Sequence, residues 1–181
     1  MSVETLCDAL PDYAADMRVN LTSLMDETLL TEQQKWGCCI ASAYAVGSGT
    51  AIKALEDGCP LSKEALASAK AAAGIMAMNN VFYRTISLMK SREYATVPAK
   101  LHMNIIADPG VPKTDFELFS MAVSAINGCG VCLDSHEEVL RKSGTPTPNI
   151  AAAFRIAAVV NAVSPILIAE DAAKAKDQAE N

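Results

Sequence analysis

The apolar and polar positions of this chain follow the spacing of α-helices. No segment alternates with a period of two for long enough to predict a strand. Alanine-rich stretches at 65–77 and 151–160 favour closely packed helices, and we therefore predict an all-α fold. Periodicity and capping patterns place the helices at residues 3–16, 19–26, 31–47, 50–57, 62–90, 94–107, 114–127, 129–143 and 147–168, with a solvated tail after 169.

Polar residues mark where several of these helices begin. Thr31, Ser62 and Thr114 each offer a side-chain oxygen that can cap a helix, and acidic residues follow each of them in the first turn. Gly58 and Gly144 mark ends, because each is followed within a few residues by proline. The helix limits are therefore well defined by local chemistry.

A weak internal repeat appears when Thr31 is aligned with Thr114, because apolar positions that follow then coincide. We predict a single helical domain over residues 1–181 made of two related modules. Its parts are a first module at about residues 20–90, a second at about 100–168 and a tail at 169–181. The first module carries Val46 and Gly49 where the second carries cysteines, so only the second is expected to hold chemistry.

The charge balance narrows the choice of partners. Lys and Arg number 15 against 21 Asp and Glu, a formal charge of −6, which argues against nonspecific binding to nucleic acid. The first residues, "MSVETLCDAL", include early acids and no basic region before an apolar core, so we expect no secretory signal and a cytoplasmic protein. The apolar C-terminal segment is interrupted by Arg155, Asn161 and Pro165, which predicts a core helix and no membrane span.

The stretch "NGCGVCLDSHEEVLRKSG" at 127–144 contains the candidate chemistry. Asn127 and Gly128 interrupt a helix, and the next is expected to begin near Cys129, where the helix dipole favours a thiolate. Cys132 lies one turn later, so the two sulfurs can reach each other. A disulfide that closes so short a loop adds little stability, and its use would be redox chemistry.

A histidine and a carboxylate complete the candidate site. His136 follows Cys132 by four residues on the same helix face, where its imidazole can accept the thiol proton and then stabilise the thiolate. Glu117, twelve residues before Cys129, is the best candidate to orient that imidazole from the preceding helix. Three competing acids are expected to face water instead: Asp134, Glu137 and Glu138.

Two other interpretations of the motif stay open. The thiols could be incidental to a non-redox enzyme in which His136 is a general base, or they could belong to a metal-bound or redox-sensing module without turnover. The sequence offers no second CxxC or HxxH to complete a zinc site. The remaining cysteines are expected to serve packing or to lie in loops: Cys7, Cys38, Cys39 and Cys59. His102 has no thiol or carboxylate at matching spacing.

The chain resembles the alkylhydroperoxidase D family, within the wider carboxymuconolactone decarboxylase-like superfamily. The resemblance rests on Glu117, Cys129, Cys132 and His136 in "FELFSMAVSAINGCGVCLDSHEEVL" and on the preceding "MNIIADPGVPKTD". It extends over most of the chain, including "LTEQQKWGCCIASAYAVG". It implies an all-helical fold with duplicated modules, assembled as a homotrimer or a multiple of it, and the thiol-dependent reduction of organic hydroperoxides.

The resemblance also implies a role for each site residue. Cys132 would attack the peroxide and become a sulfenic acid, Cys129 would donate a proton and then resolve the sulfenic acid as a disulfide, and Glu117 with His136 would form a proton relay. Family members carry a second histidine where this chain has Val131, which predicts weaker peroxidase activity or a main role as a reductant.

The partners implied by the resemblance supply and accept electrons. Dihydrolipoamide, carried on a lipoyl-bearing 2-oxoacid dehydrogenase component, would reduce the disulfide. An alkyl hydroperoxide reductase-type peroxiredoxin would be reduced in turn. The resemblance implies no bound cofactor, and no metal site is expected.

Overall fold

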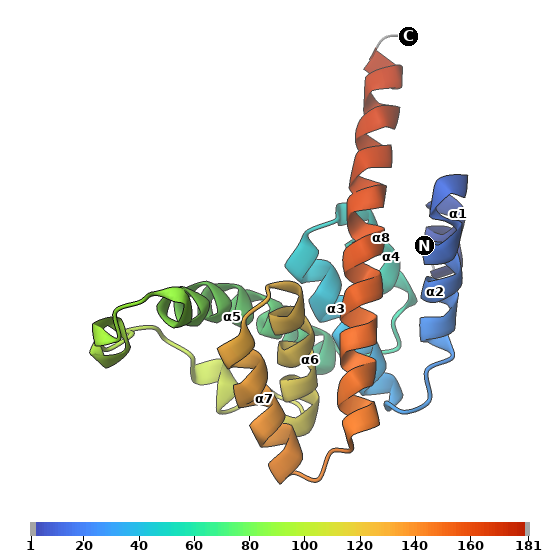
Figure 1. Ribbon diagram of the computed structural model, residues 1–181. Helices are drawn as coiled ribbons and strands as arrows, with labels where there is room; N and C mark the ends of the chain where they lie inside the picture. Colours follow the sequence, from blue (N-terminus) through green and yellow to red (C-terminus); the bar gives the residue numbers. More distant parts are fainter. Residues whose placement is uncertain (1–2, 180–181) are drawn as a thin grey trace.

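Helices supply the regular structure of residues 3–179, the part of the chain that the computed structural model describes (Figure 1). They are α1 (Val3–Ala9), α2 (Ala15–Met25), α3 (Glu32–Val46), α4 (Gly49–Gly58), α5 (Lys63–Leu88), α6 (Lys113–Ile126), α7 (Gly130–Lys142) and α8 (Thr147–Ala179). Three short 3-10 turns complete the order: η1 (Asp12–Ala14), η2 (Glu93–Thr96) and η3 (Asn104–Ile106). No strand occurs within these described residues, and the prediction of an all-α fold is confirmed.

Helices α3 and α6 form the centre of the molecule. Every residue of 35–43 in α3 and of 115–124 in α6 is buried, as expected for helices covered on all sides. The two helices pack against each other, and both also contact α5 and α8 (Figure 1). Helix α7 packs on α5 and α6, while α1 and α2 lie beside each other at one flank. The division into two modules stays a prediction.

Helices α3 and α6 approach each other closely at Gly37. A Cβ atom built on Gly37 would lie 2.1 Å from two ring carbons of Phe119, which is itself fully buried. Only glycine therefore leaves room for the phenylalanine ring at this contact. Because α6 also carries Glu117, this contact helps to set the position of the candidate site.

Side-chain caps begin two of the long helices as predicted. The Thr31 hydroxyl accepts a hydrogen bond from the backbone N–H of Gln34, and the Gln34 side chain accepts one from the backbone N–H of Thr31. Ser62 caps α5 by accepting from the backbone N–H of Ala65. The prediction for Thr114 was wrong, since α6 begins at Lys113 without a side-chain cap.

Two predicted helix extents were wrong because of proline. The expected helix at 94–107 is replaced by η2, η3 and extended chain. Pro98 holds Val97 in the extended region, with ψ of 127°, and Lys100 adopts a positive φ of 53°, so no helix passes through this segment. The expected helix at 3–16 is likewise broken before Pro11.

The helix predicted to end at residue 168 is longer in the structure, although the described residues of the predicted tail are solvated as expected, with Glu170 partly buried. Helix α8 continues through Ala179, because this segment is rich in alanine and in charged residues that favour helices. Residues 180 and 181 of the predicted tail, like residues 1 and 2, lie outside the described residues. The added turns project beyond the other helices (Figure 1).

Helix α8 packs along the centre of the molecule. The segment Thr147–Gln178 is long and apolar enough to cross a membrane, but 56% of its apolar window is buried inside the structure. Helix α8 contacts α2, α3, α4 and α6 through fully buried side chains that include Ala152, Ile156 and Ala157. This burial is what the prediction of a core helix requires.

We predict that Gly37→Ala lowers the free energy of unfolding by about 1–3 kcal/mol, because the added methyl group displaces the ring of Phe119. Urea unfolding followed by circular dichroism measures the change. Gly74→Ala is the matched control, since Gly74 lies within α5 with open space around its Cα. The control should stabilise the protein by up to about 1 kcal/mol. Equal stabilisation by both substitutions would contradict the close approach of α3 to α6.

Candidate active site

The candidate site is built on the turn between α6 and α7. The backbone N–H of Gly128 donates to the carbonyl of Ala125, and the backbone N–H of Cys129 donates to the carbonyl of Ser124, each over 3.1 Å. Gly128 has a positive φ of 63°, a conformation that glycine adopts without strain. These two bonds and the left-handed glycine form a Schellman motif, which ends α6 and makes Cys129 the N-cap of α7.

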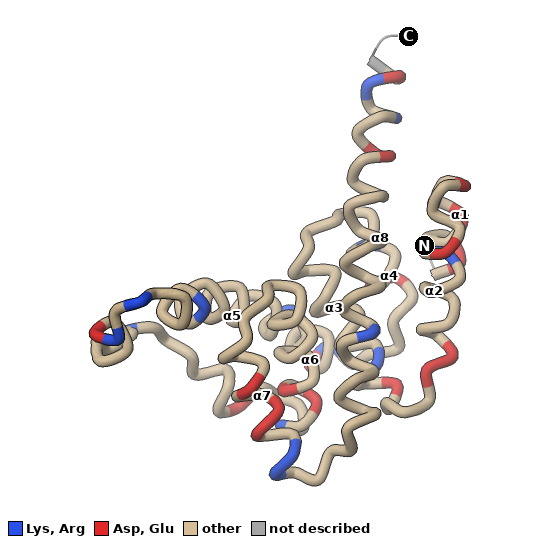
Figure 2. Tube along the Cα trace, viewed as in Figure 1, with Lys and Arg blue, Asp and Glu red and all other residues tan. Residues whose placement is uncertain are grey.

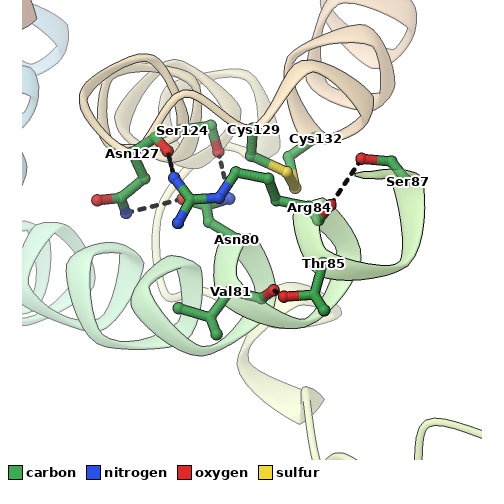
Figure 3. The surroundings of a disulfide bond; sticks show 9 residues. All are labelled: Asn80, Val81, Arg84, Thr85, Ser87, Ser124, Asn127, Cys129 and Cys132. Carbon is green, nitrogen blue, oxygen red and sulfur yellow. Dashed lines mark hydrogen bonds between the residues drawn. A yellow bond between two sulfur atoms is a disulfide. The ribbon is translucent and has the colours of Figure 1, made fainter. Parts of the chain in front are cut away.

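The two cysteines of the motif are joined by a disulfide (Figure 3). Their Cα atoms are 5.3 Å apart, and the backbone N–H of Cys132 donates to the carbonyl of Cys129 over 3.0 Å. Cys129 is 0% exposed and Cys132 is 7% exposed. Of the two sulfur-bearing residues, Cys132 is therefore the one with access to the exterior.

Glu117 and His136 form a buried hydrogen-bonded pair between α6 and α7. The Glu117 Oε2 and His136 Nδ1 atoms are 2.7 Å apart, and the side chains of Glu117 and His136 are only 6% and 11% exposed. A carboxylate at this position accepts the Nδ1 proton, which leaves the lone pair of the imidazole on Nε2. His136 Nε2 is enclosed and has no hydrogen-bond partner within the described chain. It is thus free to exchange a proton with a thiol or a ligand.

A cavity of about 250 Å³ brings the sulfur and the imidazole into one space. It lies between α5, α6 and α7 and is lined by Met76, Asn79, Tyr83, Ile106, Lys113, Glu117, Cys132, Ser135, His136 and Val139. The structure therefore places Glu117, Cys132 and His136 together, with Cys129 bonded to Cys132 behind them. Val131 is not part of this lining; its side chain is 43% exposed.

A polar network from α5 supports the turn that carries the cysteines (Figure 3). The fully buried Asn80 donates to the Ser124 hydroxyl over 2.9 Å and accepts a hydrogen bond from the Asn127 amide over 2.9 Å. The Arg84 guanidinium donates to the carbonyl of Asn127 and lies beside the disulfide. These side chains fix the end of α6, and with it the position of Cys129.

Sequence reasoning missed the contribution of α5 to the site. Asn79 and Tyr83 of α5 line the cavity, and Asn80 and Arg84 of the same helix hold the turn; Lys113, the first residue of α6, also lines the cavity and was missed as well. The signal in the sequence was two adjacent asparagines in the middle of an apolar helix, where both residues are poor helix formers. Such residues persist in a buried helix when their side chains have a specific partner.

The acidic residues that compete with Glu117 lie on the outer face of α7, as predicted. Glu137 pairs with Arg141 and Glu138 pairs with Lys142, and all four side chains are at least 47% exposed. The pair with Lys142 lowers the pKa of Glu138. Figure 2 shows these charges along the outside of α7.

The other cysteines differ from the motif in chemistry. Cys38 and Cys39 are fully buried in the core, which confirms their predicted role in packing. Burial raises the pKa of Cys38 well above its usual value and raises that of Cys39 to about 12, although the Lys35 ammonium partly offsets the effect on Cys39. Both thiols therefore stay protonated and unreactive at neutral pH.

The described residues offer no comparable second centre. A larger hollow of about 570 Å³ lies beside Cys7 and Trp36, but no histidine lines it. His102 is exposed on the segment that precedes η3. Among residues 3–179, no three His, Cys, Asp or Glu side chains gather where they could hold a metal ion.

The fold and the site together define a helical thiol protein in which a CxxC pair shares a cavity with a Glu–His pair. The model of the carboxymuconolactone decarboxylase family matches residues 92–175. A protein named alkyl hydroperoxide reductase AhpD from Maricaulis maris is 57% identical over 172 residues, which cover 94% of this chain and 99% of the relative. A protein of the same name from Hyphomonas neptunium is 56% identical, over 97% of this chain and 99% of the relative. Another from Streptomyces coelicolor is 54% identical, over 94% of this chain and 97% of the relative. This chain belongs to the alkylhydroperoxidase D (AhpD) family.

We predict that iodoacetamide modifies Cys132 in the reduced native protein and leaves Cys38 and Cys39 unmodified. Cys132 has access to solvent and a neighbouring imidazole, whereas burial keeps the two core thiols protonated. Peptide mass spectrometry over a time course measures the order of modification. The same reaction in denaturant is the control and should modify every cysteine. Modification of Cys38 or Cys39 as fast as Cys132 in the native protein would contradict the assignment.

Proposed function

We propose that this protein is an alkyl hydroperoxide reductase in which Cys129 and Cys132 cycle between dithiol and disulfide. The observation that carries the proposal is the arrangement of the disulfide beside His136 Nε2, an unpaired buried base, in a cavity open to Cys132. The name shared by the relatives described above, alkyl hydroperoxide reductase, supports the same reaction class.

The oxidative half of the cycle begins at Cys132. His136 Nε2 takes the thiol proton while Glu117 holds Nδ1, and the imidazolium stabilises the thiolate. The thiolate attacks the terminal oxygen of the hydroperoxide, the O–O bond breaks, and Cys132 becomes a sulfenic acid. The leaving alkoxide takes the proton of Cys129 and departs as an alcohol.

The disulfide then forms between the two cysteines. The Cys129 thiolate attacks the Cys132 sulfur, and hydroxide leaves as water with the proton held by His136. The N-terminal end of α7 favours the thiolate of Cys129, since Cys129 is the N-cap residue. An acidic Cys129 is a good proton donor to the alkoxide, so the helix dipole and the assignment of Cys132 as nucleophile support each other.

Dihydrolipoamide is the proposed source of electrons. Its two thiols can reduce the disulfide by exchange, and the slender chain of a lipoyl group suits a cavity of about 250 Å³. We propose that it is carried on a 2-oxoacid dehydrogenase component and that the protein acts in the cytosol without a bound cofactor. A peroxiredoxin of the alkyl hydroperoxide reductase type is the proposed protein substrate.

An exposed apolar face supports assembly into a homotrimer or a multiple of it. Val81, Leu88 and Val97 are 60%, 76% and 61% exposed, on the outer part of α5 and the segment after it. Val81 and Val97 line a mainly apolar hollow of about 350 Å³ between α5 and η2, which Met89 and Tyr94 also help to line. A monomer would leave this apolar face in water, whereas contact between copies of the chain would bury it.

We predict that Cys132→Ser and Cys129→Ser each abolish turnover of tert-butyl hydroperoxide with dihydrolipoamide, but for different reasons. Cys132→Ser removes the nucleophile, so no sulfenic acid forms. Cys129→Ser removes the resolving thiol, so a sulfenic acid accumulates on Cys132. Trapping with dimedone and mass spectrometry distinguish the two. Cys7→Ser is the control and should keep the wild-type rate. Full turnover by either Cys132→Ser or Cys129→Ser would contradict the proposed cycle.

We predict that Leu88→Glu dissociates the proposed homotrimer, because it places a charge on the exposed apolar face of an acidic protein. Analytical ultracentrifugation measures the mass in solution. Val19→Glu is the matched control, since Val19 is 65% exposed on α2, away from this face. An unchanged mass for Leu88→Glu would remove this face from the interface, and a monomeric wild type would refute the proposed assembly.

A further inference from the structure

Adjacent asparagines on α5 face different surroundings. Both hydrogen-bonding atoms of the Asn80 side chain have partners, in Ser124 and Asn127. Asn79 is 6% exposed and lines the same cavity as Cys132 and His136, and its Oδ1 atom is enclosed without a hydrogen-bond partner among the described residues. The fold therefore explains why Asn80 is buried, since both polar atoms of its side chain are hydrogen-bonded, but it does not explain the burial of Asn79.

A buried amide oxygen without a partner is unfavourable, and such groups are rare unless a ligand completes them. His136, which lines the same cavity, carries another such atom at Nε2, so two residues with an unpaired acceptor line the cavity together with Cys132. His136 Nε2 and Asn79 Oδ1 are expected to accept different protons. The imidazole takes the proton of the thiol, and the amide oxygen is left to accept a hydrogen bond from the molecule that enters the cavity.

We propose that Asn79 is a catalytic residue that holds the terminal hydroxyl of the hydroperoxide, through a hydrogen bond from that hydroxyl to Oδ1. This inference rests on the proposed function. The bond fixes the oxygen that Cys132 attacks, and the hydrogen stays on that oxygen as the sulfur–oxygen bond forms and the oxygen–oxygen bond breaks. The product on the protein is the sulfenic acid S–O–H, and the alkoxide leaves with the proton of Cys129.

The hydrogen bond also sets a requirement on the substrate. A hydroperoxide carries the O–H donor that Asn79 Oδ1 accepts, whereas a dialkyl peroxide has none. Apolar side chains that include Met76, Ile106 and Val139 line the rest of the cavity and suit a short alkyl or small aromatic group. The site thus selects hydroperoxides by their hydroxyl end.

The test compares two reactions of the fully reduced protein in single-turnover experiments. One is oxidation of Cys132 by tert-butyl hydroperoxide; the other is modification of Cys132 by methyl methanethiosulfonate, which is uncharged and has no O–H group. Asn79→Ala and the similarly sized Asn79→Leu should slow the peroxide reaction by about tenfold, the effect of one lost hydrogen bond. Both should leave the methanethiosulfonate reaction and the reduction of the disulfide by dihydrolipoamide unchanged.

Asn161→Ala is the matched control, because it makes the same chemical change at an exposed position of α8. It should react with the peroxide at the wild-type rate. Peroxide rates that stay unchanged in both Asn79 variants would overturn the inference and leave the proposed function intact. An equal loss in both reactions would also overturn it, since Asn79 would then act on the thiol. If the thiols of the reduced wild-type protein do not react with the peroxide, the proposed function is refuted, and the inference with it.

Discussion

The Schellman turn at Gly128 is the constraint on which the site depends. It ends α6 and starts α7 with a single residue between the left-handed glycine and the first residue of the new helix. The turn thereby fixes Glu117 on α6 and both Cys132 and His136 on α7. The two helices are close enough for Glu117 and His136 to form a hydrogen bond. A longer connection would let α7 rotate about its axis, and the imidazole would lose its carboxylate partner.

The surroundings of this turn show how a small site is kept rigid on a helical scaffold. The side chains of Asn80 and Arg84 hold the end of α6 from the side of α5, and the close contact at Gly37 holds α6 from the side of α3. Helices α5 and α3 therefore restrain α6 from different directions. The reactive groups themselves need few contacts with one another, because their backbones are already placed.

The parts of this structure that local chemistry determines could be predicted from the sequence. Caps at Thr31 and Ser62, the stop at Gly128 and the spacing from Cys132 to His136 all depend on residues a few positions apart. The helix predicted at 94–107 does not form, because Pro98 holds Val97 in the extended region. Asn79 was missed for a different reason, since its burial depends on the packing of α5 against α7, which no short stretch of sequence reveals.

The unequal burial of the two motif sulfurs has a consequence for the direction of electron flow. An incoming dithiol can approach only Cys132, because Cys129 is wholly enclosed. With the proposed dithiol donor, the mixed disulfide would form on Cys132, and Cys129 would be expelled as the leaving group toward the amide end of α7. Electrons would then enter and leave the protein through the Cys132 sulfur. The electron donor and the hydroperoxide could not bind at the same time, so the enzyme would follow ping-pong kinetics.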